Sequence, residues 1–402
     1  MIYLGMPALA NEKHYNGIYD CYDGATMFYW SDATEDMMNS YAKQLEELGY
    51  VKHQESEGLC VKSATYFKDT LAVHLYYLEN TAELRVIMQE NAVLPINSYA
   101  YEKVCDVAVT QLGLYQEPKV YTGMGYLIRL EDGTFVVIDG GSGFDYNAEL
   151  LYNLMLDQKP EGVEKVVVSA WIITHAHGDH NGVYMNFTRK YTDRVTVKLL
   201  IGNDAPDLVF QSSDGGCLHS FNYSDAAELF NCAYMKAHTG QQFGFPGVML
   251  TVLYTHEDLY PDVVTSYNDT SLVCDVTVKG EAVKETLNKG ETRFIFLADV
   301  HPNGAQKLID MYGEKLKCDV MQIAHHGISC YHTDLYVRCS PKVAYWPCGR
   351  NVLEYKNGSR FERPHIKYLV DTTEKIIFHA KGTHTFWFED DTVRESEIPT
   401  DC

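Results

Sequence analysis

One ten-residue segment, Trp171 to His180, limits what this chain can fold into more than any other. It opens as an apolar strand and then delivers four metal-ligand side chains within six residues: His175, His177, Asp179 and His180. Side chains alternate along an extended segment, so His175 and His177 face the same way. Gly178 lets the chain bend, which turns the next two side chains toward a second ion. Imidazole nitrogen and carboxylate oxygen are ligands of zinc and similar metals, and the segment therefore predicts two adjoining metal sites.

The alternative is a polar loop whose histidines are satisfied by neighbouring groups. It is disfavoured because three of the 16 histidines and an aspartate fall within six residues, directly after an apolar strand.

Two later apolar segments also end in ligand-type residues. Phe294 to Ala298 leads to Asp299, and Val320 to Ala324 leads to His325 and His326. Taken alone, an ordinary strand-end aspartate and a pair of buried structural histidines would explain them. Beside the first segment, they suggest that three strand ends meet at one site.

The first hundred residues predict one helix on an antiparallel sheet. Apolar residues at helical spacing favour a helix over 33–48, and Asp32 and Glu35 have the spacing of a capping box. Alternating segments predict strands at 59–67, 70–78 and 83–89.

The remainder predicts an α/β fold with two sheets and flanking helices. A hairpin at 124–130 and 135–138 opens it, which makes an all-parallel sheet an unfavourable choice. The other expected strands cover 166–174, 248–254, 271–278, 293–298 and 318–323. Helices are expected at 146–157 and 303–313, and 181–250 is expected to be irregular.

Composition narrows the possible partners. The chain has 402 residues and a net charge of −22, which repels polyanions at long range, so nucleic acid is an unfavourable partner. A small phosphorylated substrate stays compatible, because metal ions dominate the local field. The sequence has no apolar run long enough for a membrane span and no basic-then-apolar leader, so the cytoplasm is expected. The 11 cysteines form no CxxC pair, as expected for free thiols in a reducing compartment.

The His-Ala-His-Gly-Asp-His motif after an apolar strand resembles the signature of the metallo-β-lactamase superfamily. The resemblance extends over roughly 118–390 and includes the opening hairpin and the Asp139-Gly140-Gly141 turn. It implies an αβ/βα sandwich with metals at one edge. We therefore expect two domains: a small α+β domain of undefined role over 1–117 and a metallo-β-lactamase-like hydrolase domain over 118–402.

The resemblance also implies roles for the later motifs. Asp299 would bridge two metals and His326 would complete the second, with His325 as a proton donor, although these two histidines could be exchanged. The expected metal ligands are His175, His177, Asp179, His180, Asp299 and His326, and the expected catalytic residues are Asp179 and His325. The third ligand of the first metal stays open among His219, His238, His256 and Asn268.

The later half is similar to the branch that contains the hydrolase domain of the bacterial DNA-uptake channel and the phosphorylcholine esterases. The matching segments are Asn268–Val273, the strand that leads to Asp299, His325–Gly327, Pro341–Tyr345 and Arg363–His365. Ala298 and Ile328 depart from that branch. In this branch His365 would line the pocket.

The resemblance implies a binuclear hydrolase in which a metal-bound hydroxide attacks a phosphodiester of a small molecule. Zinc is the expected metal, with manganese or iron as alternatives. The competing interpretations are hydrolysis of an ester, thioester or lactone at the same site, and a metal-site protein that binds without turnover.

Overall fold

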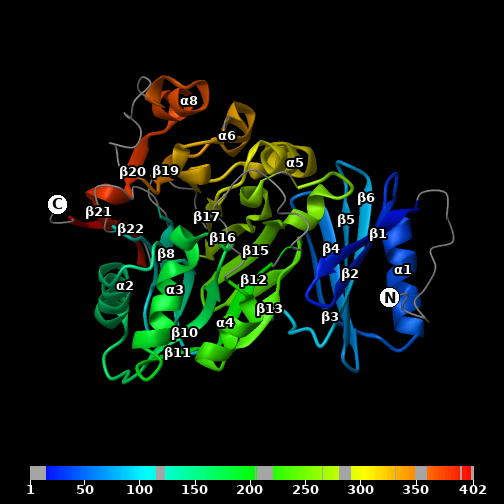
Figure 1. Ribbon diagram of the computed structural model, residues 1–402, viewed down its shortest axis with the longest axis horizontal. Helices are drawn as coiled ribbons and strands as arrows, with labels where there is room; N and C mark the ends of the chain where they lie inside the picture. Colours follow the sequence, from blue (N-terminus) through cyan, green and yellow to red (C-terminus); the bar gives the residue numbers. More distant parts are fainter. Residues whose placement is uncertain are drawn as a thin grey trace.

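The computed structural model describes three β-sheets with helices packed around them (Figure 1). The described residues are 15–114, 123–203, 205, 221–264, 266–279, 291–330, 332–348, 360–389 and 392–399. Within these ranges the sheets have six, nine and seven strands. Each helix in the same ranges is too short or too polar to cross a membrane.

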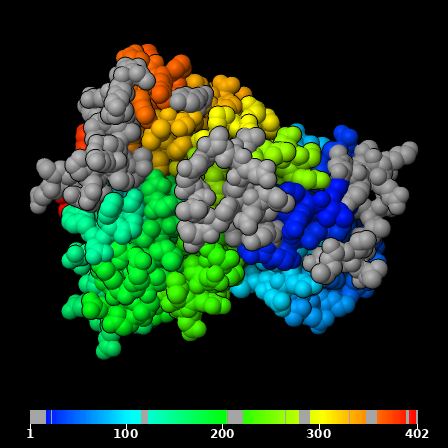
Figure 2. All heavy atoms as spheres, in the orientation of Figure 1, coloured from blue at the N-terminus to red at the C-terminus, as the bar shows by residue number. Residues whose placement is uncertain are grey.

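The six-stranded sheet is antiparallel and is formed by the N-terminal part of the chain. Its strands are β1 (Tyr15–Tyr22), β2 (Ala25–Trp30), β3 (Val51–Gly58), β4 (Val61–Lys68), β5 (Leu71–Leu78) and β6 (Glu83–Glu90), in the order β1-β2-β6-β5-β4-β3. Helix α1 (Glu35–Glu47) packs Met38, Tyr41 and Leu45 against one face. Figure 2 shows this sheet as one end of the molecule.

The two larger sheets enclose a shared apolar core. The nine-stranded sheet runs β13-β12-β10-β9-β8-β7-β21-β22, with β11 beside β10, and the seven-stranded sheet runs β14-β15-β16-β17-β18-β19-β20. Tyr126 of β8 and Phe296 of β17 meet in this core with ring centroids 4.7 Å apart.

The strands of the nine-stranded sheet are β7 (Val107–Gln111), β8 (Gly125–Arg129), β9 (Phe135–Asp139), β10 (Val166–Ile172), β11 (Val195–Val197), β12 (Leu199–Gly202), β13 (Ala233–Lys236), β21 (Gly382–Glu389) and β22 (Thr392–Pro399). Those of the seven-stranded sheet are β14 (Gln242–Phe245), β15 (Val248–Tyr254), β16 (Val273–Lys279), β17 (Glu291–Phe296), β18 (Val320–Gln322), β19 (Val343–Trp346) and β20 (Lys375–Phe378).

Helices cover the outer face of each large sheet. The nine-stranded sheet carries α2 (Asp145–Gln158), α3 (Gly178–Lys190) and α4 (Tyr223–Phe230), and the seven-stranded sheet carries α5 (Pro302–Tyr312), α6 (Thr333–Cys339) and α8 (Pro364–Thr372). The shorter helical turns include η3 (His256–Leu259), η4 (Tyr267–Thr270) and η6 (Ala324–Gly327). The layers are therefore helix, sheet, sheet, helix, as the αβ/βα expectation has it, with an additional N-terminal antiparallel sheet.

Two sequence expectations were wrong. Within 181–250 the structure describes 181–203, 205 and 221–250, and these ranges are largely regular. They hold most of α3 together with α4 and strands of only three to seven residues, whose apolar runs are too short to show a period. Helix α1 is capped by Thr34, whose side chain accepts a hydrogen bond from the Met37 amide, and not by Asp32. The division of the chain at residue 117 stays a prediction; β7, which precedes that residue, pairs with β8 and β21.

The N-terminal sheet contacts the larger sandwich through a buried arginine. Arg85 of β6 is fully buried and donates to the carbonyl oxygens of Glu257 (2.7 Å), Asp258 (3.0 Å) and Tyr260 (2.8 Å). Its guanidinium also pairs with Glu83 at 2.7 Å, and Glu83 in turn accepts from Lys307 of α5 at 2.7 Å. The sheet is therefore tied to η3 and to α5.

Candidate metal centre

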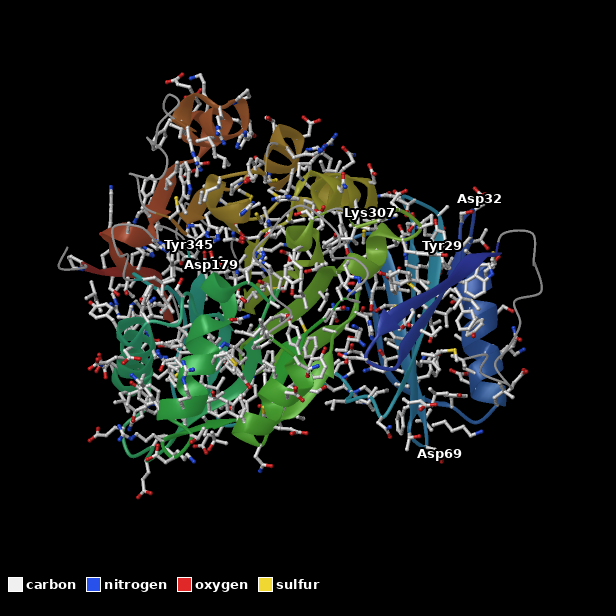
Figure 3. The ribbon with its side chains drawn as sticks, in the orientation of Figure 1. Tyr29, Asp32, Asp69, Asp179, Lys307 and Tyr345 are labelled. Atoms are coloured by element: carbon white, nitrogen blue, oxygen red, sulfur yellow. The ribbon has the colours of Figure 1, made fainter. Side chains whose placement is uncertain are left out.

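Three strand ends from two different sheets converge on one site. Strand β10 leads to His175, whereas β17 leads to Asp299 and its parallel neighbour β18 leads to the His325-His326 pair. Asp179 stands in the first turn of α3, and Figure 3 shows it at the end of α3 that faces the seven-stranded sheet. The convergence brings together residues more than 100 positions apart in the chain.

The Asp299 carboxylate is the centre of this site. Its Oδ2 atom lies 3.2 Å from Nε2 of both His180 and His326, and 3.8 Å from Nε2 of both His175 and His325. Four imidazoles from two sheets therefore surround one buried carboxylate oxygen.

Two groups of three residues have their ligand atoms within 4.8 Å of one another. The groups are His175, His177 and Asp299, and Asp179, His180 and His326. Together they comprise the six metal ligands expected from the sequence, brought close enough for two adjoining cations.

Asp139, at the end of β9, fixes one of these imidazoles. Its carboxylate accepts hydrogen bonds from the Thr174 amide and hydroxyl, both at 2.8 Å, and from Nδ1 of His180 at 2.7 Å. Since Nδ1 of His180 carries the proton in that bond, Nε2 is the nitrogen that faces Asp299, and it would offer its lone pair to a cation when the ring is neutral. A carboxylate behind a histidine is the usual support of a metal-binding imidazole.

A hydrogen bond from Nδ1 also orients the ring of His326, in this case to a backbone carbonyl oxygen. Its Nδ1 donates to the carbonyl of Pro347 at 3.1 Å, so Nε2 is the nitrogen that faces Asp179 and Asp299, and it would offer its lone pair to a cation when the ring is neutral. The turn that presents it is strained, with φ of 45° at His325 and 52° at His326, in the left-handed region that non-glycine residues rarely adopt.

Gly327 continues this turn at φ 68°, and a Cβ there would lie 2.6 Å from Nε1 of Trp346. Only glycine therefore fits after the histidine pair.

The segment before β16 holds the end of β17 in place. The Asp299 amide donates to the Ser271 hydroxyl at 3.2 Å. Asp269 accepts, through Oδ1, from the amides of His301 and Gly304 at the start of α5, both at 3.1 Å. The Asn268-to-Ser271 segment thus sets the backbone around Asp299.

The donor set fits a pair of divalent cations. His180 Nε2, His326 Nε2 and Asp299 Oδ1 are buried and make no hydrogen bond of acceptable geometry, although such atoms are costly to bury without a partner. Burial alone would lower the pKa of His180. The carboxylates of Asp299 and Asp139 nevertheless hold that pKa well above its usual value. A site that draws a positive charge onto a fully buried imidazole is one that favours a cation.

Two further acid-base groups of the site, His325 and Asp179, have pKa values that their surroundings lower. Burial lowers the pKa of His325 to about 4, so this ring is neutral near pH 7. Although burial opposes it, His326 and His180 hold the pKa of Asp179 far below the usual range, so this carboxylate is ionised.

The candidates for a further ligand of the first metal lie outside both groups. His238 donates from Nδ1 to Glu257 at 2.9 Å, and His256 is buried in η3. Asn268 instead contacts Nε2 of His301 through Nδ2 at 3.2 Å. His219 lies outside the described residues. His365 is buried beside Tyr336, with ring centroids 6.2 Å apart.

Sequence reasoning missed three residues at this site. Asp139 was identified only as part of a turn, although it ends an apolar strand just as Asp299 does. Tyr267 covers His177 with ring centroids 4.9 Å apart. His301 contacts His325 with Nε2 and Nδ1 2.8 Å apart. Neither Tyr267 nor His301 follows a spacing that would have revealed its position.

Residues 120–211 match the family model described as the Metallo-beta-lactamase superfamily. No curated protein matches the chain.

Similar solved structures include a diiron β-hydroxylase, CmlA, from Streptomyces venezuelae, at 12% identity, with 75% of this chain and 55% of that one covered and a TM-score of 0.36. A Cronobacter sakazakii metallo-β-lactamase mutant matches at 14% identity over 50% of this chain and 70% of that one, with a TM-score of 0.27. The chain thus spans about half the length of the CmlA structure.

Proposed function

We propose that this chain, of which residues 120–211 match the metallo-β-lactamase superfamily model, is a binuclear metal-dependent hydrolase acting on a phosphodiester of a small molecule. The observation that carries the proposal is the convergence of four imidazoles on Asp299, with buried ligand atoms of His180 and His326 that no other group satisfies.

The six proposed ligands divide between two cations. His175 and His177 would hold one, Asp179, His180 and His326 the other, and Asp299 would bridge them. Zinc suits this nitrogen-rich set, with manganese or iron as alternatives. When bound, the two cations supply Lewis acidity to the substrate and lower the pKa of a water from about 15.7 toward neutrality.

The residues of the chain would orient the reactants. The Asp179 side chain is 25% exposed, whereas that of His326, 3.4 Å away, is 1% exposed. Asp179 is thus the ligand on the open side, where it would accept a hydrogen bond from the attacking water. Tyr267 closes the side beside His177. His325, at the opposite edge of Asp299, would handle the proton of the leaving group.

The choice of a phosphodiester rests on the branch resemblance of the segments at Asn268–Val273 and His325–Gly327. The same site chemistry would also attack an ester, thioester or lactone carbonyl. A chromogenic panel separates these: bis(4-nitrophenyl) phosphate against 4-nitrophenyl acetate, a thioester and a lactone, each with zinc or manganese.

Replacement of Asp299 tests the site itself. We expect Asp299→Ala to hold fewer than two metals per chain and to lose at least about 100-fold in kcat/KM, because both cations lose their shared carboxylate. Asp310→Ala, which removes an exposed carboxylate of α5, is the matched control. Hydrolysis by a folded Asp299→Ala protein at the wild-type rate would remove the proposal, and turnover of the carbonyl substrates alone would replace the phosphodiester.

A further inference from the structure

A cavity of about 210 Å³ opens where the segment after the N-terminal sheet crosses the larger sandwich. Three parts of the chain line it: the crossing segment with Tyr99 and Tyr101, the β8–β9 turn with Glu131, and the β14–β15 hairpin with Phe245 and Met249. We propose that this cavity is a binding site for a small alkylammonium ion. The proposal does not depend on the metal centre and adds a second binding site to the chain.

Backbone contacts hold the three parts of the lining together. The Glu131 amide donates to the Pro246 carbonyl oxygen at 3.2 Å, and the Glu131 carbonyl oxygen accepts from the Val104 amide at 2.8 Å. Gly247 has a φ of 76°, and a Cβ there would lie 2.6 Å from Cγ of Glu131. The hairpin therefore approaches Glu131 as closely as a glycine permits. Because the cavity is already formed, a ligand would lose little free energy in ordering it.

Two tyrosine rings form a corner of the cavity wall. Tyr99 and Tyr101 meet edge to face, with ring centroids 6.5 Å apart and ring planes inclined by 76°. Aromatic faces attract a cation that lies within about 6 Å of the ring centroid. The alkyl groups of such a cation would bury apolar surface against Phe245 and Met249.

The hydroxyls of both tyrosines are bonded to carboxylates. Tyr101 donates to Oε2 of Glu131, and Tyr99 bonds the Asp132 carboxylate. Burial and these bonds raise the pKa of both hydroxyls, so each hydroxyl stays protonated and donates. The two hydroxyls and Glu131 therefore offer a ligand acceptor oxygens and no further hydrogen. Acceptors beside aromatic rings suit a cation and disfavour an anion.

The charges around the cavity favour the same kind of ligand. The Glu131 side chain is 16% exposed, so water screens its charge only in part. Lys103 Nζ lies 3.4 Å from Oε1 of Glu131 but 3.0 Å from Asp106, and its side chain is 43% exposed. Such an exposed pair is weak, so Lys103 is a competitor that can stay with Asp106 when a cation enters. The net charge of −22 attracts cations to the molecule as a whole.

The size and composition of the cavity limit the choice of cation. Sites for drug-sized ligands hold about 300–1,000 Å³, so a cavity of about 210 Å³ takes a smaller molecule. A metal ion fits less well, because among the described residues Glu131 belongs to neither group of mutually close metal-ligand atoms. A compact ammonium ion with alkyl groups matches the rings, the carboxylate and the volume.

The cavity is separate from the metal centre. Glu131 precedes β9, whereas Asp139 ends that five-residue strand at the metal centre. A ligand beside Glu131 would therefore not contact the reactants.

The first measurement uses tetramethylammonium as the probe. In the zinc-loaded full chain, labelled with ¹³C at the methionine methyl groups and kept at constant ionic strength, we expect a saturable shift of the Met249 signal. A Met249→Leu sample assigns that signal, and buried Met311 should not shift. Neopentyl alcohol has nearly the same shape but no charge, and it should bind about tenfold more weakly.

The second measurement repeats the titration with variants. Glu131→Gln and Tyr99→Leu should each weaken tetramethylammonium binding about tenfold, because they remove the charge and one ring. Lys103→Met should strengthen it about threefold, because it removes the competing cation. Glu149→Gln and Tyr146→Leu, both at exposed positions of α2, are the matched controls and should bind as the wild type does.

Lys103→Met also tests the proposal independently of any disturbance that Glu131→Gln causes in the β8–β9 turn, because a disturbed turn cannot strengthen binding. Equal affinity for the charged and uncharged probes would overturn the proposal. So would a Met249 signal that does not shift at tens of millimolar tetramethylammonium, or wild-type affinity in both Glu131→Gln and Lys103→Met. None of these outcomes bears on the proposed hydrolase.

Discussion

Two buried polar clusters in this molecule contain the same kinds of residue but differ in whether their buried polar atoms have hydrogen-bond partners. The metal centre joins His175, His180, His326 and Asp299. The interface cluster, between the N-terminal sheet and the sandwich, is formed by five residues that are at most 3% exposed: His74, Arg85, His238, Glu257 and Asp258. Composition and burial therefore do not distinguish a metal site from a structural contact.

The interface cluster pairs its donors with acceptors. Asp258 accepts from the Tyr76 hydroxyl at 2.9 Å and from the Thr239 hydroxyl at 2.6 Å. His74 contacts the Thr65 hydroxyl and the Thr239 carbonyl oxygen, both at 2.9 Å. At the metal centre Nε2 of His180 and Nε2 of His326 instead lie 3.2 Å from Asp299 Oδ2 and make no hydrogen bond of acceptable geometry. The interface cluster is balanced without an added ion, whereas the metal centre would be balanced by the proposed cations.

The largest expected effect breaks the interface cluster. Arg85→Met leaves three backbone carbonyls and part of Glu83 without their buried partner, so we expect a loss of about 3–5 kcal/mol in the free energy of unfolding. Urea unfolding measures it, and the metal content of the folded protein should stay at two.

Lys43→Met, which removes an exposed helix pair with Glu47, should cost at most about 0.5 kcal/mol. Equal stabilities of the two variants would show that the buried arginine contributes nothing.

We expect a smaller effect from replacing Asp139, the carboxylate that orients His180 in the metal centre. Asp139→Asn removes the charge that holds Nδ1 of His180, and metal affinity should fall about 10- to 100-fold. Titration calorimetry with zinc measures this, with Asp145→Asn on exposed α2 surface as the control. An unchanged zinc affinity of Asp139→Asn would show that the Asp139 charge does not orient His180 for metal binding.

The smallest expected effect is the pH dependence that His74, in the interface cluster, gives to the free energy of unfolding. Burial lowers the pKa of His74 to about 3, whereas the unfolded chain titrates near about 6.5. Between these values the unfolded state binds the extra proton, so stability is full above about pH 6.5 and falls by about 1.4 kcal/mol per unit below it. At pH 5.5 the contribution of His74 is a loss of about 1.4 kcal/mol.

His74→Gln should flatten the pH dependence of urea unfolding, measured with chelator, by about one proton. A slope identical to that of the wild type would contradict the neutral, buried state of His74.

The contrast between the clusters also explains what the sequence could predict. The metal centre draws its ligands from strand ends, where the change from apolar to ligand-type residues is visible at His175, Asp299 and His325. Ten of the 22 described strands and three of the described helices, α1, α2 and α5, were predicted from apolar patterns of this kind. The interface cluster has no such mark, because His74 and Arg85 alternate with apolar residues inside ordinary strands.

What the sequence could not provide were contacts between elements distant in the chain. Asp139 meets His180 only because β9 and β10 are neighbours in register. His301 meets His325 because α5 begins beside the turn after β18. Such pairs follow from packing in three dimensions, and no local spacing encodes them.

Anomalous scattering from crystals of the wild type grown with zinc would test the central claim most directly. We predict two adjoining peaks, one within bonding distance of His175, His177 and Asp299 and one within bonding distance of Asp179, His180 and His326, with none at His74 or His238. A zinc peak in the interface cluster, or a metal centre that stays empty at saturating zinc, would contradict the account.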